Sequence, residues 1–196
     1  MALISNNEIK RVKSLQQKKF RDESGLFVVE GGKMVEEALR SGFKVESVYM
    51  KEDIGEEAMK RISALSSPSP ALAVVRKPDY IYADDPTCLS SLYSSEGLYL
   101  ALDSIRDPGN LGTILRIADW FGIDAVFATK DTVDVFNPKT VQATMGAIFR
   151  VKMHYVDLPS LSKGFIRDGG SIYGTFLDGH DIYTRELSTG TYAPSM

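Results

Sequence analysis

Three polar residues that suit an anionic substrate follow one short apolar run of the chain. Asp107, Asn110 and Arg116 come after the run 98–102, across a Pro-Gly loop and into an amphipathic segment over 111–121 that predicts a helix. In an open α/β sheet, ligands bind at the carboxyl ends of the strands. The planar guanidinium of an arginine stays charged and binds phosphate through two parallel hydrogen bonds. We therefore expect an anionic substrate at this sheet edge.

The order and spacing of this segment are specific. Written as D-P-x-N-x-G-x-x-x-R-x-A-x-x-F-G, the segment resembles motif 1 of the SpoU/TrmH-type RNA 2′-O-ribose methyltransferases, a branch of the SPOUT superfamily. Ile117 stands where these proteins commonly have a threonine, and the polar positions are unaffected. The matching residues are Asp107, Pro108, Asn110, Gly112, Arg116, Ala118, Phe121 and Gly122.

The resemblance implies methyl transfer from S-adenosylmethionine to a ribose 2′-hydroxyl of RNA, with ribosomal RNA as the expected substrate. It makes Arg116 the catalytic residue. Because a guanidinium is a very poor base, we expect Arg116 to anchor phosphate and to ease loss of the hydroxyl proton. Asn110 is predicted to cap a helix that begins at Leu111 and to present its amide to the ribose or to Arg116. Asp107 and Gly112 are expected to shape the turn and to permit a close approach.

A second segment, 137–147, resembles the family pattern N-P-K-x-x-R-A-S-x-G-A. Gln142 replaces the usual arginine and removes its positive charge, whereas Thr144 keeps the hydroxyl of the usual serine. Lys139 lies near the start of the helix expected over 138–147. There it is either a contact to RNA phosphate or a solvated surface lysine.

A third segment runs from residue 171 to 179, and its first part predicts a strand over 171–176. In the family, the loop at this place borders the S-adenosylmethionine pocket. The resemblance therefore makes Thr175, Phe176 and Leu177 candidate neighbours of the cofactor. An ordinary strand end followed by a turn is the alternative.

The N-terminal stretch is rich in cations, with Glu8 as the single acid between residues 8 and 21. On a helix, these side chains form either a phosphate-contacting patch or an ordinary solvated face. Together with 25–31, the stretch resembles the small substrate-binding domain that many of these methyltransferases carry, which is similar in fold to RNA-binding ribosomal proteins. The predicted RNA contacts are Lys10, Lys13, Lys18, Lys19 and Arg21, together with Lys139.

Strand and helix patterns alternate along the chain, which predicts an α/β fold. In the first part we expect strands at 26–29, 45–50 and 71–75, separated by helices. In the second part the order predicts a mainly parallel sheet. Its strands are expected at 98–102, 124–128, 151–156 and 171–176, and its helices at 111–121, 138–147 and 158–168.

A change of composition after residue 77 predicts a boundary between two domains. We expect a small N-terminal α/β RNA-binding domain at 1–80, a linker at 81–96 and a methyltransferase domain at 97–196. By resemblance, the second domain has the SPOUT trefoil-knot architecture.

The composition limits the class of protein. The chain has 196 residues, of which 43% are hydrophobic and 25% charged, which is typical of a globular protein. A net charge of −3 argues against a general nucleic-acid binder and favours a local basic patch. The single cysteine, Cys88, excludes an internal disulfide, and the distant His154 and His180 offer no metal site. With no apolar run near the ~20 residues of a membrane span, we expect a cytoplasmic protein that binds neither membrane nor metal.

Two further family motifs, a Gly-Glu-Gly loop and a turn with serine and asparagine, are not found in the sequence before Met196. In the family they supply most contacts to the cofactor, so we expect a truncated chain.

Two hypotheses remain: a methyltransferase, expected as a homodimer, or a non-catalytic RNA-binding module if the chain ends at residue 196. A Rossmann-type enzyme is excluded because 107–112 lacks the spacing G-x-G-x-x-G.

Overall fold

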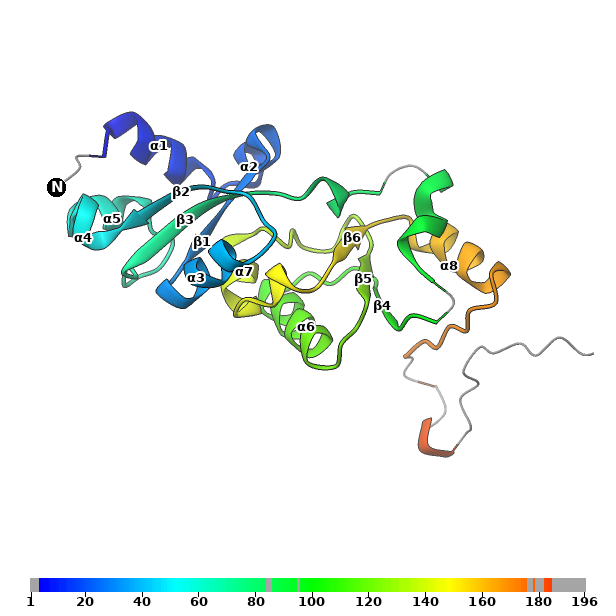
Figure 1. Ribbon diagram of the computed structural model, residues 1–196. Helices are drawn as coiled ribbons and strands as arrows, with labels where there is room; N and C mark the ends of the chain where they lie inside the picture. Colours follow the sequence, from blue (N-terminus) through cyan, green and yellow to red (C-terminus); the bar gives the residue numbers. More distant parts are fainter. Residues whose placement is uncertain (1–3, 84–85, 95, 176–177, 179–181, 185–196) are drawn as a thin grey trace, which may run out of the picture.

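The computed structural model describes residues 4–83, 86–94, 96–175, 178 and 182–184, and it contains two three-stranded sheets (Figure 1). The strand order is β1-β3-β2 in the first sheet and β4-β5-β6 in the second. Helices flank both sheets, as the alternating sequence pattern predicts. The fold is therefore α/β.

The first sheet is antiparallel and consists of β1 (Leu26–Glu30), β2 (Val45–Met50) and β3 (Ala71–Arg76). The central strand β3 pairs with both neighbours, and its first five residues are buried. Such a continuous apolar run is typical of a strand covered on both faces. The three strands confirm the elements predicted for this part of the chain.

The helices of the first half are α1 (Asn6–Ser14), α2 (Lys18–Ser24), α3 (Gly32–Arg40), α4 (Lys51–Ile54) and α5 (Glu56–Ile62). Apolar side chains of α1 and α5 pack on one face of the first sheet. Those of α3 pack on the opposite face, together with residues of the second half. The basic stretch expected on one helix is thus divided between α1 and α2.

The second sheet is parallel and consists of β4 (Tyr99–Leu102), β5 (Ala125–Ala128) and β6 (Met153–Tyr155). The parallel strands and their order confirm the prediction for this half. The helix α6 (Pro108–Trp120) follows β4 and packs into the larger core. The helices α7 (Pro138–Thr144) and α8 (Leu158–Arg167) follow β5 and β6, respectively, with Leu161 of α8 packed against Phe127 on the other face.

The strand predicted at 171–176 is wrong for its described part. Residues 171–175 have no regular secondary structure, lie outside the sheet and are all exposed. A strand is stable only when its backbone is paired and one face is buried. The described residues of this segment meet neither condition.

The two halves share one core. Phe27 of the first sheet stacks against Phe136 with ring centroids 4.6 Å apart, and the same cluster includes Leu111 and Leu115 of α6. The segment expected to be a linker is also packed, since Ile81 and Leu89 are buried. The short 3₁₀ helices are η1 (Asp79–Ile81), η2 (Pro86–Leu92), η3 (Ala147–Phe149) and η4 (Ile182–Thr184).

Candidate active site and RNA-facing surface

The loop that leads from β4 to α6 is held by the loop after β5. The Ser104 backbone N–H donates to Oγ1 of Thr129 at 2.9 Å, and the Ile105 N–H donates to Oγ1 of Thr132 at 3.2 Å. Ser104 has a positive φ of 56°, a conformation that is uncommon outside glycine, and its hydroxyl donates to Asp131. Hydrogen bonds from Thr129 and Ser104 lower the pKa of Asp131. The loop is therefore fixed before any substrate binds.

Asp107, not Asn110, is the N-cap of α6. Its side chain accepts a hydrogen bond from the backbone N–H of Asn110 at 2.7 Å, and Pro108 occupies the first helical position. The prediction that Asn110 caps a helix starting at Leu111 is therefore wrong. Proline at the first position and aspartate before it are a favourable helix start, which displaces the boundary by three residues. The Asn110 side chain is left exposed in the first turn.

Gly112 permits α6 and α7 to approach closely. A Cβ atom at this position would lie 2.4 Å from Cβ of Ala143. Glycine is thus required at position 112 because the backbone of α7 lies so close. This contact fixes the direction of the helix that carries Arg116.

The side chain of Arg116 is exposed on α6 and makes no hydrogen bond or ion pair within the described residues. Every other arginine that the structure describes has a partner. These are Arg11, Arg21, Arg40, Arg76, Arg106, Arg150 and Arg167, which pair with carboxylates, and Arg61, which donates to Asn6. A guanidinium left without a counter-charge on a helix surface is available to an anionic ligand.

Asn110 and Arg116 lie on the same helix but do not contact each other. Six residues separate them, which corresponds to about 9 Å along the helix axis. Thr113 lies between them, and its hydroxyl donates to the carbonyl of Gly109 at 2.9 Å. The arrangement places an amide and a guanidinium at two points along one exposed surface.

The second motif is only partly available to a ligand. Asn137 caps α7 by accepting from the Lys139 N–H at 2.9 Å, and the Lys139 side chain is exposed. The Thr144 hydroxyl is buried and donates to the carbonyl of Val141 at 2.7 Å. The hydroxyl at this position therefore stabilises the end of α7.

The predicted cofactor neighbours do not form a pocket in the described residues. Thr175 is exposed and lies outside the sheet, and Phe176 and Leu177 fall outside the residues that the structure describes. Of the three predicted neighbours, the structure thus places only Thr175. No step of the reaction is assigned to these three positions.

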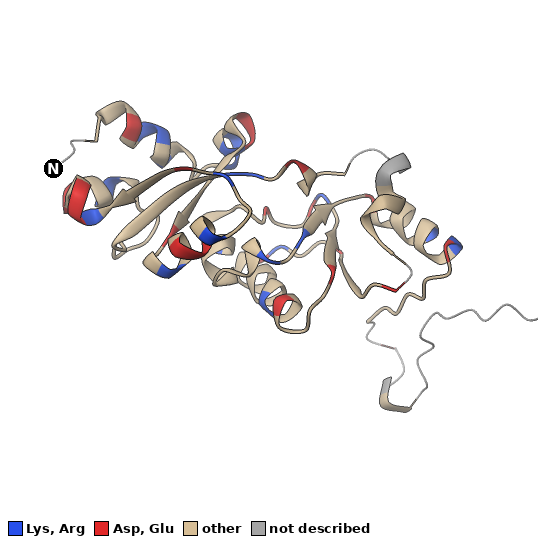
Figure 2. Ribbon diagram, viewed as in Figure 1, with Lys and Arg blue, Asp and Glu red and all other residues tan. Residues whose placement is uncertain are grey.

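The N-terminal lysines are exposed on α1 and α2, two helices on whose ribbons Figure 2 shows both basic and acidic positions. Lys18 pairs with Asp22 at 2.5 Å and Lys19 with Glu23 at 3.9 Å. Lys10 and Lys13 have no such partner within the described part of the chain. The predicted basic patch therefore has its free charge on α1.

Arg21 is removed from the predicted RNA contacts by its burial. Its side chain is 2% exposed and donates to Asp134 at 2.7 Å and to the carbonyls of Leu15 and Gln16. The correction has a simple cause: the chain turns between α1 and α2, which brings Arg21 inside. A cation in a basic run gives no signal of this kind in the sequence.

The sequence analysis did not identify one group of cations, which lies at the seam where the first and second halves of the chain pack together. Lys44 and Lys77 come from the first half, and Arg150 and Lys152 from the second, yet all four line one cavity. These residues are as much as 108 positions apart, and no motif contains them. Only the packing of the two halves brings them together.

Other site classes have little support among the residues that are described. No group of three or more His, Cys, Asp or Glu side chains could hold a metal ion in that part of the chain. Within the same part, every helix is too short or too polar to cross a bilayer.

Models of two families match the chain. Residues 6–76 match the MRM3-like substrate binding domain, and residues 97–193 match the SpoU rRNA Methylase family. The two matches lie on either side of the packed connector. They correspond to the first and second sheets, respectively.

The chain is also similar to curated proteins. It is 30% identical to the 23S rRNA (guanosine(2553)-2′-O)-methyltransferase RlmP of Bacillus subtilis, over 96% of this chain and 77% of that protein. It is 34% identical to the mitochondrial rRNA methyltransferase 3 of Xenopus laevis, over 76% of this chain. The matched region spans 40% of the length of that second relative.

Solved structures show the same fold. A TrmH-family putative RNA methyltransferase from Porphyromonas gingivalis has a TM-score of 0.82 and 36% identity, covering 95% of this chain and 77% of that one. An AdoMet-bound rRNA methyltransferase from Sinorhizobium meliloti has a TM-score of 0.70 and 30% identity, covering 85% and 66%. The chain therefore belongs to the SpoU/TrmH family of RNA 2′-O-ribose methyltransferases, which use S-adenosylmethionine.

Proposed function

We propose that this chain methylates a ribose 2′-hydroxyl of ribosomal RNA and that Arg116 holds the substrate. The observation that carries the proposal is the unpaired, exposed guanidinium of Arg116 on α6, next to a loop fixed by hydrogen bonds. Membership of the family supports the same reaction. Arg116 is the one described arginine whose side chain makes no hydrogen bond or ion pair to the protein.

The residues of this chain position the substrate. S-adenosylmethionine, when bound, supplies the methyl group from its sulfonium. Arg116 would bind an RNA phosphate beside the target nucleotide and align the hydroxyl oxygen for in-line attack. Its charge would also stabilise the negative charge that grows on this oxygen as the proton leaves. The exposed amide of Asn110 would hydrogen-bond the ribose.

The remaining assignments form part of the same proposal. The two family matches support a division into an RNA-binding domain at 1–80, a connector at 81–96 and a methyltransferase domain at 97–196. Lys10, Lys13, Lys18, Lys19 and Lys139 are exposed, which supports their assignment as RNA contacts. We also propose that the protein works in the cytoplasm as a homodimer. Thr175, Phe176 and Leu177 are the proposed cofactor neighbours.

Substitution of Arg116 tests the proposed function. Arg116→Ala should lower methyl transfer by about 10²–10³-fold, the usual loss when one electrostatic donor is removed. Arg116→Lys should recover little, because an ammonium cannot bind phosphate in the two-point geometry. The measurement is transfer of labelled methyl groups from S-adenosylmethionine to ribosomal RNA.

Arg40→Ala is the matched control, since Arg40 is exposed on α3, outside the motif, and already pairs with Glu36. It should leave turnover unchanged. Near-normal turnover of Arg116→Ala would refute the assignment. Wild-type protein that binds RNA without transferring methyl groups would instead favour an RNA-binding module.

A further inference from the structure

The seam between the two halves contains a cavity of about 400 Å³, which we call the seam cavity. One side is formed by residues 42–44 and 76–80, and the other by residues 149–152. Neither half forms the cavity alone. Its volume lies within the usual range for small-ligand sites, about 300–1,000 Å³.

The seam cavity is strongly basic. Five cations line it against the single carboxylate of Asp79. Three of these cations, Arg76, Lys77 and Arg150, already pair with acids of the protein. The other two, Lys44 and Lys152, are exposed, and their ammonium groups have no hydrogen bond or ion pair within the residues that the structure covers. The unbalanced charge favours an anion.

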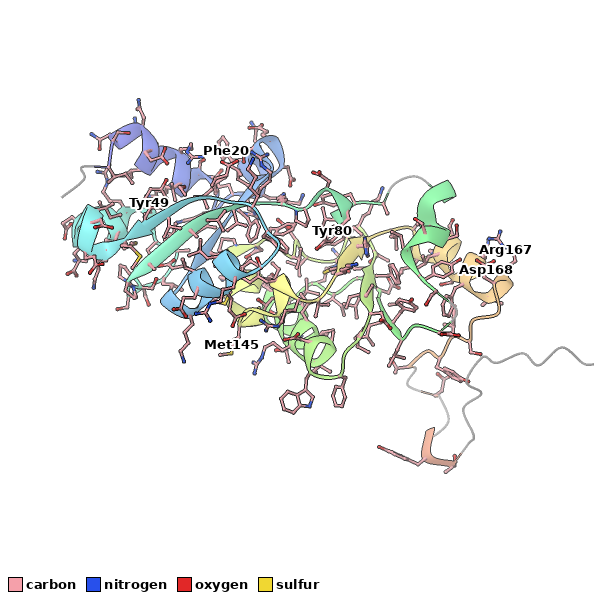
Figure 3. All side chains as sticks on the ribbon, viewed as in Figure 1. Phe20, Tyr49, Tyr80, Met145, Arg167 and Asp168 are labelled. Atoms are coloured by element: carbon pink, nitrogen blue, oxygen red, sulfur yellow. The ribbon has the colours of Figure 1, made fainter. Side chains whose placement is uncertain are left out.

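The cavity also has aromatic walls. Phe43 and Phe149 meet edge to face with their ring centroids 5.3 Å apart. Tyr80 lies beside β6 (Figure 3), and it is 39% exposed. Its carbonyl contacts Nδ1 of His154 at 2.8 Å, and its ring packs against the same imidazole. Because a carbonyl oxygen only accepts, Nδ1 of His154 is the donor, and burial lowers the pKa of this imidazole.

The seam cavity lies on the α6 side of the first sheet. Arg150, which lines it, bonds to Asp119 of α6 at 2.8 Å, and Asp119 lies about one turn from Arg116. In contrast, α1 packs on the opposite face of the sheet (Figure 1). A strand held at Arg116 can therefore reach the seam cavity without crossing the sheet.

We propose that the seam cavity binds one nucleotide of single-stranded RNA next to the methylated position. Its base would stack on Tyr80 and Phe43, and its phosphate would bind between Lys44 and Lys152. Aromatic rings beside cations are the usual means of holding an unpaired nucleotide, whereas the bases of an A-form duplex are inaccessible to such rings. The inference rests on the proposed function, because it assumes an RNA substrate.

The charge of the cavity is tested with a double variant. Lys44→Ala with Lys152→Ala should weaken binding of a fluorescein-labelled oligouridylate by about tenfold. It should also lower the slope of log affinity against log salt by about 0.7 to 1.4. The matched control is Lys33→Ala with Lys163→Ala, which removes two exposed, unpaired lysines elsewhere. The control should have little effect on either quantity.

The stacking is tested at Tyr80. Tyr80→Ala should weaken oligouridylate binding by about tenfold, and Tyr80→Phe should restore it, because the ring carries the contact. With 4-thiouridine in the oligonucleotide, photo-crosslinks should map to residues 43 and 80. A purely structural role of Tyr80 would not produce crosslinks there.

All of these measurements are repeated with the Arg116→Ala variant, because RNA binding and crosslinking do not depend on methyl transfer. If this variant is inactive but still binds and crosslinks at the seam cavity, the inference stands. Equal affinities for the double variant and its control would overturn it. So would an equal loss of binding to duplex RNA or to heparin, since the surface would then be a general anion-binding one.

Discussion

The guanidinium of Arg21 donates two hydrogen bonds to one oxygen of Asp134, at 2.7 and 3.1 Å. The side chains of the two residues are 2% and 4% exposed. A buried ion pair of this kind is strongly destabilised when one partner is removed, because the other charge stays unpaired. The contact joins α2 to the loop between β5 and α7, so it also links the two halves.

Replacement of Arg21 should therefore change stability. Arg21→Met keeps the side-chain volume but leaves Asp134 unpaired, and the free energy of unfolding should fall by about 3–5 kcal/mol. The double variant Arg21→Met with Asp134→Leu should regain most of the loss. Urea denaturation followed by circular dichroism measures both. If the Arg21→Met variant has normal stability but binds RNA more weakly, Arg21 is an RNA contact after all.

At the scale of elements, α1 and α2 differ in free charge although both are rich in lysine. Lys18 and Lys19 pair with Asp22 and Glu23, whereas Lys10 and Lys13 have no counter-charge in the described part of the chain. RNA affinity depends on the cations that are free to replace counterions. The two helices should therefore contribute unequally.

Charge reversal separates their contributions. Lys10→Glu with Lys13→Glu should weaken oligouridylate binding and lower the slope of log affinity against log salt by about 0.7 for each phosphate that is no longer bound. Lys18→Glu with Lys19→Glu changes the same number of charges and should have a smaller effect. Fluorescence anisotropy at several salt concentrations gives both slopes. Equal slopes for the two pairs and the wild type would identify all four lysines as solvated surface.

The elements that the sequence predicts are those whose signal is local. The buried strands and the helix after Asp107 are recognisable because apolar runs and capping residues act on their own neighbours. The prediction of a strand at 171–176 is wrong for its described part because a strand requires a neighbouring strand to pair with, which a local sequence pattern does not provide. Asn110 was misplaced as a cap because Asp107 and Pro108 offer a better helix start.

The candidate site shows the same limit. Arg116 was predicted from its motif, and its position on the exposed face of α6 agrees with that role. Two features depend on contacts between the two halves: the burial of Arg21, and the placement of Lys44 and Lys152 around one cavity. Such contacts join residues about a hundred positions apart, and no pattern in one sequence encodes them.

At the scale of the molecule, one core spans both halves. Apolar residues of the first sheet, α3, α6 and the loops after β5 form a single cluster. Arg150 adds ion pairs to Glu37 of α3 and Asp119 of α6. The seam is therefore a packed interface, and it fixes the relative position of the proposed RNA-binding and catalytic residues.

The same molecule has an apolar surface that the described residues leave uncovered. At the end of α6, Ile117, Trp120 and Phe121 are 48%, 82% and 70% exposed. Monomeric proteins rarely expose such a group of large apolar side chains, which usually mark an interface. We propose that a second copy of the chain covers this surface in the homodimer.

Substitution at this surface should separate the copies. Trp120→Glu should raise the dimer dissociation constant by about 30-fold or more, since a buried tryptophan at an interface contributes at least ~2 kcal/mol. Leu39→Glu is the control, because Leu39 is 57% exposed on another helix, α3. Sedimentation velocity over a range of concentrations gives the association state of each variant. A wild-type protein that stays monomeric throughout, or a Trp120→Glu variant that still dimerises normally, would show that this face has another partner.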